Sequence, residues 1–115
     1  MSSFAPSTAQ AWALLLVAGL LEIGWAVGIK STEGFTRPGP SAVVLVTALL
    51  SFYLLALAMK TLPVGTAYAV WVGIGAVGAA VLGIALLGEA PSPPRIASIL
   101  LIVGGVVGLR LFSEP

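Results

Sequence analysis

Residues 11–30 read AWALLLVAGLLEIGWAVGIK, an apolar run that contains one acidic side chain and ends at a lysine. About 20 apolar residues in an α-helix are long enough to cross the hydrocarbon core of a bilayer. The run lacks the basic segment that opens a secretory signal, and it stays apolar beyond Glu22. We therefore interpret it as a retained transmembrane helix.

Three further apolar stretches follow, separated by short segments rich in proline, glycine and charge. The second stretch ends at Lys60, and Pro63 stands where the first turn of a helix tolerates proline. Three prolines between Gly88 and Pro94 prevent the third helix from continuing. We expect one all-α integral membrane domain, residues 1–115, with four transmembrane helices per chain, at residues 11–30, 40–59, 63–87 and 94–112.

The composition agrees with a chain surrounded by lipid. Hydrophobic residues make up 59% of the 115 residues and charged residues 8%, whereas a water-soluble domain carries about a quarter charged residues. The absence of Cys and His removes disulfides, thiolate metal sites, imidazole bases and cysteine nucleophiles. We expect no enzyme activity, no catalytic residue, no metal and no cofactor. The net charge of +1 offers no face for nucleic acid, and the expected location is the plasma or inner membrane, crossed several times.

Positive charges in the loops give almost no preference for one orientation. With the N-terminus in the cytoplasm, that side holds Lys60 and Arg110, and the other side holds Lys30, Arg37 and Arg95. Loop Lys and Arg residues set the orientation of membrane helices, so two against three is nearly no bias. We hypothesise dual topology, in which oppositely oriented copies pair. The alternative is a fixed orientation set by one extra charge.

Glu22 is the acidic residue of the first span and the best candidate for its chemistry. It lies roughly 16 Å into the span, near the middle of the membrane. An acid at that depth costs about 2.5 to 3.5 kcal/mol on insertion scales and is by default a functional hypothesis. Burial disfavours its charged form, and a second copy across a dimer axis would disfavour it further. Such a pair could exchange protons for a cation; the alternative is a protonated glutamate that bonds neighbouring helices.

Four other side chains are candidates for the same site. Trp25 lies three positions after Glu22 and shares its side of the helix, and Tyr68 and Trp71 share a face of the third helix by the same spacing. Ser51 lies near the middle of the second helix. If the first three helices face one cavity, these groups supply donors and aromatic walls to a carboxylate site. Ordinary packing, an interfacial belt or a bond from serine to its own helix are the alternatives.

Two groups of glycines have separate interpretations. Gly104 and Gly108 form a G-x-x-x-G motif, reinforced by Gly105, and this spacing lets helix backbones approach closely. We assign them to a dimer interface, with packing within the chain as the alternative. Gly73 and Gly75 belong to a glycine cluster that weakens the third helix and favours a hinge there. Packing explains that cluster equally well.

These stretches together resemble the small multidrug resistance family. The resemblance covers nearly all of the chain after the first ten residues, and it rests on residues 19–26 (GLLEIGWA), Lys30 with residues 34–37 (GFTR), residues 51–55 (SFYLL) and residues 60–71 (KTLPVGTAYAVW). Trp25, Ser51 and the Gly65-Thr66 pair make the chain similar to the guanidinium-exporter subtype. Val72 departs from the threonine often found there, and the polar head is longer than usual.

The resemblance implies an antiparallel homodimer that exports guanidinium in exchange for protons. Glu22 of both subunits would bind either substrate or protons. The implied network around these acids consists of Gly19, Trp25, Ser51, Tyr68 and Trp71, and the implied hinge of Gly73 and Gly75. Expected partners are guanidinium or a related small cation, protons, membrane lipids and a second copy of the chain. Guanidinium suits such acids because it is planar, permanently charged and matched to carboxylates.

Three alternatives remain from the sequence. A polyspecific exporter of hydrophobic quaternary ammonium compounds would use the same architecture but select by apolar wall area. A proton-carrying subunit of a membrane assembly also keeps one buried glutamate among small residues. A helper subunit that needs a paralogous partner would agree with the weak charge bias.

Overall fold

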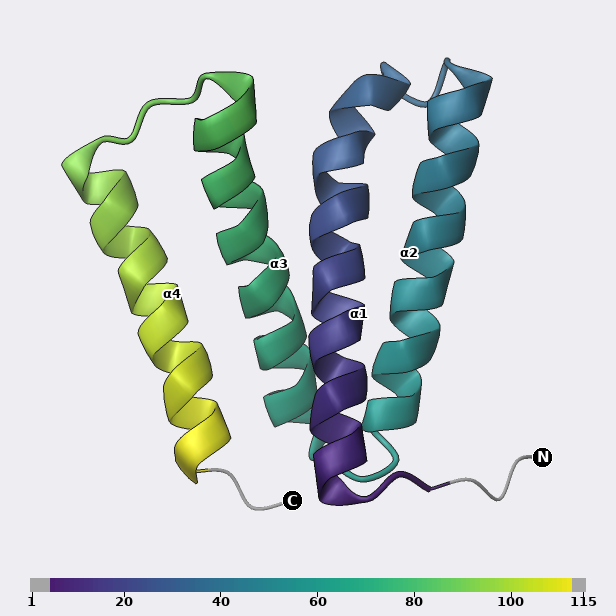
Figure 1. The fold of residues 1–115 in the computed structure, drawn as a ribbon, viewed down its shortest axis with the longest axis vertical. Coiled ribbons are helices and arrows are strands. Elements are labelled where there is room, and N and C mark those ends of the chain that lie inside the picture. Colours follow the sequence, from purple (N-terminus) through teal and green to yellow (C-terminus); the bar gives the residue numbers. More distant parts are fainter. Residues whose placement is uncertain (1–4, 113–115) are drawn as a thin grey trace.

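The structure, a computed structural model, describes residues 5–112 and consists of four long helices (Figure 1). They are α1 (Thr8–Gly28), α2 (Pro38–Ala58), α3 (Val64–Leu87) and α4 (Pro93–Phe112), and a short 3-10 helix, η1 (Ile29–Thr32), continues α1. In this described part of the chain, all four helices are long and apolar enough to cross a membrane. The prediction of an all-α fold with four transmembrane helices is confirmed.

α1 begins at Thr8, ahead of the predicted start at residue 11, because Ser7 caps it. The Ser7 hydroxyl accepts a hydrogen bond from the backbone N–H of Gln10, and the Gln10 side chain accepts one from the N–H of Ser7. This reciprocal capping box satisfies N–H groups that the first turn of a helix otherwise leaves free. The polar segment before the apolar run therefore already forms the first turn of α1.

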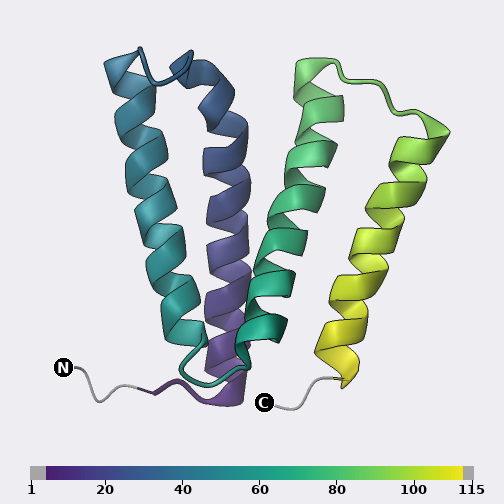
Figure 2. The ribbon, with the colours of Figure 1, turned by 180° about the vertical axis from the view of Figure 1, so that it is seen from behind.

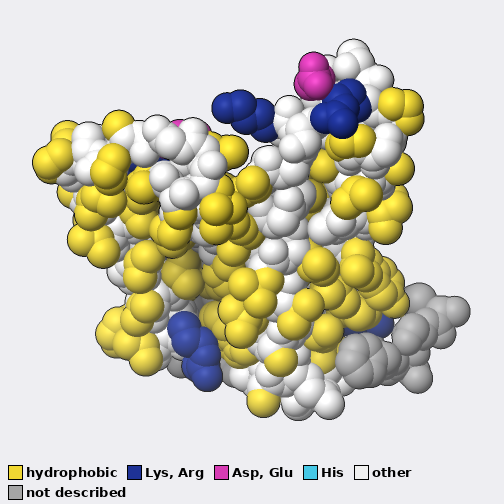
Figure 3. Space-filling model, turned by 45° about the horizontal axis from the view of Figure 1, so that its top comes forward, with side chains coloured by type: hydrophobic (Ala, Val, Ile, Leu, Met, Phe, Trp, Pro, Cys, Tyr) yellow, Lys and Arg dark blue, Asp and Glu magenta, His cyan; other side chains and the backbone are white. Residues whose placement is uncertain are grey.

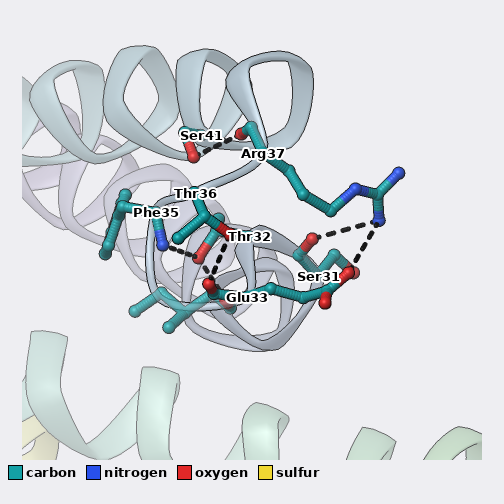
Figure 4. Close-up of polar contacts among 8 residues, drawn as sticks. Ser31, Thr32, Glu33, Phe35, Thr36, Arg37 and Ser41 are labelled. Atoms are coloured by element: carbon teal, nitrogen blue, oxygen red, sulfur yellow. Dashed lines mark hydrogen bonds and ion pairs between the residues drawn. The ribbon is translucent and has the colours of Figure 1, made fainter.

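The connection between α1 and α2 is a compact turn built around Thr32 (Figure 4). The Thr32 side chain is fully buried; its hydroxyl donates to the Ile29 carbonyl at 2.7 Å and accepts from the Phe35 N–H at 3.1 Å. Glu33, Gly34 and Phe35 have φ angles of 49°, 73° and 64°, a left-handed region that residues with a Cβ rarely adopt. The two hydrogen bonds of Thr32 hold this unusual run in place.

The helices pack unevenly around α1. α1 lies along both α2 and α3, whereas α4 contacts α3 and diverges from the other two (Figures 1 and 2). The core lies where the start of α1, the end of α2 and the start of α3 meet, and its buried hydrophobic members include Leu15, Ala18, Leu55, Ala58, Val70 and Trp71. α1 and α3 run in the same direction and separate toward their C-terminal ends (Figure 2).

α4 is the most exposed helix. None of its residues, all within the described range, is buried, and Leu101 exposes 77% of its surface. Its C-terminal end is tied to α1 by Arg110, whose guanidinium lies 5.0 Å from the centre of the Trp12 ring, a cation–π contact. Figure 3 shows hydrophobic side chains over the middle of the bundle and charged ones near the helix ends, as expected for a lipid-facing surface.

Candidate functional site

Glu22 points from the middle of α1 toward α3, where its carboxyl lies against Gly75. A Cβ placed on Gly75 would overlap that carboxyl, so any larger residue at this position would have to displace it. The Oε1 atom of Glu22 is buried and has no hydrogen-bond partner among the described residues. Leaving a buried polar atom unsatisfied costs about 1 to 3 kcal/mol. Within the described chain this oxygen is therefore available to a group from outside it.

Ser51 connects the first three helices one helical turn away from Glu22. It is fully buried; its hydroxyl donates to the Ala18 carbonyl of α1 at 2.7 Å and accepts from the indole Nε1 of Trp71 at 2.9 Å. Ala18 precedes Glu22 by four residues, so this chain of bonds fixes the part of α1 just below the acid. Ser51 thus bonds to the backbone of α1 and to α3, rather than to the carboxyl itself.

Four aromatic rings form a continuous row across the same helices. The ring centres of Trp25 and Phe52 lie 6.1 Å apart, those of Phe52 and Trp71 5.5 Å, and those of Trp71 and Tyr68 5.7 Å. Such edge-on and tilted contacts are favourable between aromatic side chains. Trp25 and Trp71 are therefore brought to one region, together with Tyr68, which is 53% exposed at the end of the row. The indole Nε1 of Trp25 is buried and lacks an acceptor in the described part of the chain.

Several glycines of α1 and α3 are positions of close approach. A Cβ on Gly19 would come within 2.7 Å of the Ile74 side chain, and one on Gly73 would meet Val106 of α4 at 2.5 Å. Both distances are too short for real carbon contacts. Gly73 therefore faces α4 while Gly75 faces α1, and α3 is one continuous α-helix through both. A hinge at these glycines stays a prediction, and the packing role is directly visible.

Gly104, Gly105 and Gly108 lie on open surface of α4. A Cβ placed on any of them meets no neighbouring atom within 4 Å in residues 5–112. They do not contribute to packing within the described chain. A small, flat helix surface of this kind allows another helix to approach closely.

Sequence reasoning missed two parts of the site. Phe52 completes the aromatic row, although it directly follows Ser51 in the sequence and could have been found as the neighbour of a candidate. The Ala18 carbonyl accepts the Ser51 hydrogen bond, and no sequence signal marks a backbone acceptor.

Comparison with known proteins extends these observations. Residues 10–102 match the family model described as Small Multidrug Resistance protein. Proteins named Guanidinium exporter from Salmonella typhimurium (strain LT2) and from Escherichia coli (strain K12) are each 59% identical over 105 residues, which is 91% of this chain and all of each relative. A protein of the same name from Citrobacter freundii is 58% identical over the same length.

We expect Ser51→Ala to destabilise the helix bundle by about 1 to 3 kcal/mol, because it leaves the Trp71 Nε1 buried without an acceptor. Ser98→Ala is the matched control, since the exposed Ser98 hydroxyl bonds only to the Pro94 carbonyl of its own helix. The measurement is the free energy of unfolding of the purified chain in mixed micelles titrated with a denaturing detergent. Equal losses in the two variants would contradict the proposed importance of the Ser51 network.

Proposed function

Because this chain belongs to the Small Multidrug Resistance family, we propose that it is a proton-coupled antiporter that exports guanidinium. The chain is a multi-pass membrane transporter of the inner membrane, with four helices of spanning length in its described part. Its similarity to proteins named Guanidinium exporter supports the choice of substrate. The observation that carries the proposal is the buried Glu22 oxygen that has no partner in its own described chain.

Guanidinium and protons compete for the same carboxyl in this mechanism. Guanidinium is planar, stays charged at physiological pH and presents N–H donors that match carboxylate oxygens two at a time. A buried carboxylate is stabilised by either a proton or this cation. Loading one expels the other, so a proton gradient drives export of the cation. Coupling holds as long as the empty, charged site rarely exchanges sides of the membrane.

The surrounding groups position the acid and form the walls of the site. The bonds from Ser51 to Ala18 and Trp71 hold α1, α2 and α3 in register next to Glu22. The unpaired Trp25 Nε1 is a donor available to a carboxylate, and the faces of aromatic rings attract a cation. These contacts favour a small planar cation.

The functional unit in this proposal is an antiparallel homodimer with Glu22 contributed by each copy. Each chain is then one domain, residues 1–115, and the open glycine surface of α4 pairs with its counterpart. Opposite orientations make the two end states of transport equivalent, with the roles of the subunits exchanged. The dimer thereby provides the inverted repeat on which alternating access depends in many transporters.

Glu22→Gln abolishes guanidinium-driven proton movement in this mechanism, because an amide neither titrates nor carries the charge that binds the cation. The measurement is the substrate-evoked current of liposomes on a solid-supported bilayer, which should fall to the level of empty liposomes. Glu33→Gln, in the exposed α1–α2 turn, should retain the wild-type current. A wild-type response to tetraalkylammonium ions without any to guanidinium would instead favour a quaternary ammonium exporter.

Gly75→Ala should weaken guanidinium binding, because the added Cβ displaces the Glu22 carboxyl. Overpacking of this kind costs about 1 to 3 kcal/mol, and the same free energy lost from binding corresponds to a KM increase of about 5- to 150-fold. Gly65→Ala is the control on the same helix, since its Cβ meets no neighbour within 4 Å. The concentration dependence of the same currents gives KM, and an unchanged KM in Gly75→Ala would argue against contact between the site and α3.

Dual topology predicts that a single cysteine added after residue 115 is labelled from both sides of the membrane. The chain has no cysteine of its own, so the added thiol is a unique probe. Intact cells and inverted vesicles treated with a membrane-impermeant maleimide should each label about half of the protein, because opposite orientations are equally populated in an antiparallel dimer. Labelling from one side alone would establish a fixed orientation and remove the antiparallel homodimer.

A further inference from the structure

The connection between α3 and α4 holds a carboxylate in a defined position. Gly88 ends α3 with a φ of 72°, and the Glu89 N–H donates back to the Gly83 carbonyl at 3.1 Å. The Glu89 carboxylate lies directly over Gly83, where any Cβ would overlap it. Glu89 is thus held against the end of α3 by its backbone and by the shape of the helix beneath its side chain.

Arg95, at the start of α4, forms an ion pair with this carboxylate. One guanidinium nitrogen of Arg95, Nη2, contacts one oxygen of Glu89, Oε1, and the two side chains are 35% and 39% exposed. Arginine and carboxylate pair most strongly through two parallel hydrogen bonds, and half-exposed ion pairs of this kind contribute about 0 to 1 kcal/mol. The pair is therefore open to exchange with another guanidinium group.

A cavity of about 320 Å³ connects this pair with the seam between α1 and α3. Lys30, Glu89 and Arg95 line it together with Ala26 and Ala79. Ala26 lies four residues after Glu22, and Ala79 lies four residues after Gly75. Because α1 and α3 run in the same direction (Figure 1), the near end of the cavity lies one helical turn, about 6 Å, along the seam from the contact between Glu22 and Gly75. Glu89 lies farther along the seam, over Gly83, which follows Gly75 by eight residues.

We propose that Glu89 is a second, weaker guanidinium site, in which the transported cation replaces the guanidinium of Arg95 on its way to or from Glu22. This inference rests on the proposed function, because its ligand is the proposed substrate. The exchange keeps the charge at Glu89 balanced, since one guanidinium leaves as another binds. The displaced Arg95 side chain is long enough to extend to the membrane interface.

Lys30 limits how strongly a cation binds there. Lys30 lines the same cavity as Glu89 and Arg95, so the three side chains together carry one net positive charge. Repulsion from Lys30 shortens the time that guanidinium spends on Glu89. Guanidinium therefore binds Glu89 only briefly on its path, and Glu89 does not compete with Glu22 as the main binding site.

The α1–α2 turn offers a matched control, because it contains the other Glu–Arg pair of the described chain (Figure 4). Glu33 and Arg37 lie 3.8 Å apart, four residues apart in sequence, and their side chains are 69% and 55% exposed. This pair has the same chemistry but is more exposed than the Glu89–Arg95 pair, and neither of its residues lines the cavity. Replacing Glu33 with glutamine therefore measures the effect of losing a loop carboxylate that does not line the cavity.

The test compares the two halves of the Glu89–Arg95 pair, in the full-length chain reconstituted in liposomes. KM and maximal current for guanidinium are measured on a solid-supported bilayer for wild type, Glu89→Gln, Arg95→Gln and Glu33→Gln. Glu89→Gln removes the second site and should raise KM about two- to fivefold, the range of a half-exposed ion pair. Arg95→Gln vacates Glu89 for the substrate and should lower KM. Maximal currents should stay within about twofold of wild type, and Glu33→Gln should leave KM unchanged.

Opposite shifts of KM in Glu89→Gln and Arg95→Gln support the second site, because both variants break the ion pair equally and a purely structural pair would shift KM in one direction. Shifts of the same sign, or an unchanged KM in Glu89→Gln, overturn it. A wild-type chain without guanidinium current overturns the proposed function and this inference together. If a glutamine variant is not monodisperse, Glu89→Asp and Arg95→Lys are measured in place of the two glutamine variants. Their KM values should shift in the same directions as expected for the glutamine variants, by smaller factors.

Discussion

A carboxyl group in the middle of an apolar, membrane-spanning helix is costly to keep charged, and this constraint organises the candidate site. The Glu22 Oε1 atom lacks a partner in the described chain, so its free energy depends on what arrives from outside. In the proposed mechanism, a proton and a planar cation compete for this carboxylate, and each of them meets that need. The neighbouring helices hold the acid at this depth without neutralising it.

Two kinds of contact achieve that positioning. Hydrogen bonds from Ser51 to Ala18 and from Trp71 to Ser51 join α1, α2 and α3 at one level. Just beyond that level the approach of α3 is steric, because Gly75 leaves room for the carboxyl itself. Polar contacts therefore fix the helices, and the missing side chain at Gly75 creates the space that the acid occupies.

The helices, the deep acid of α1 and the grouping of Trp25, Tyr68 and Trp71 could be predicted, because long apolar runs, charges and i,i+3 spacing are local properties of a sequence. The early start of α1 is also encoded in the sequence, in the capping box of Ser7 and Gln10, which lies ahead of the apolar run. The Ala18 carbonyl and the position of Phe52 could not be predicted, since they depend on the register between helices. The glycines of α3 were ambiguous because a small residue permits both bending and close packing.

The distribution of the core has a consequence for how the helices depend on one another. The buried hydrophobic residues of the described chain all lie between Ala11 and Trp71, and α4 adds none. The packing of α1, α2 and α3 therefore does not require any side chain of α4 to be buried. The outer face of α4 can change its neighbour without disturbing the apolar core of the other three helices.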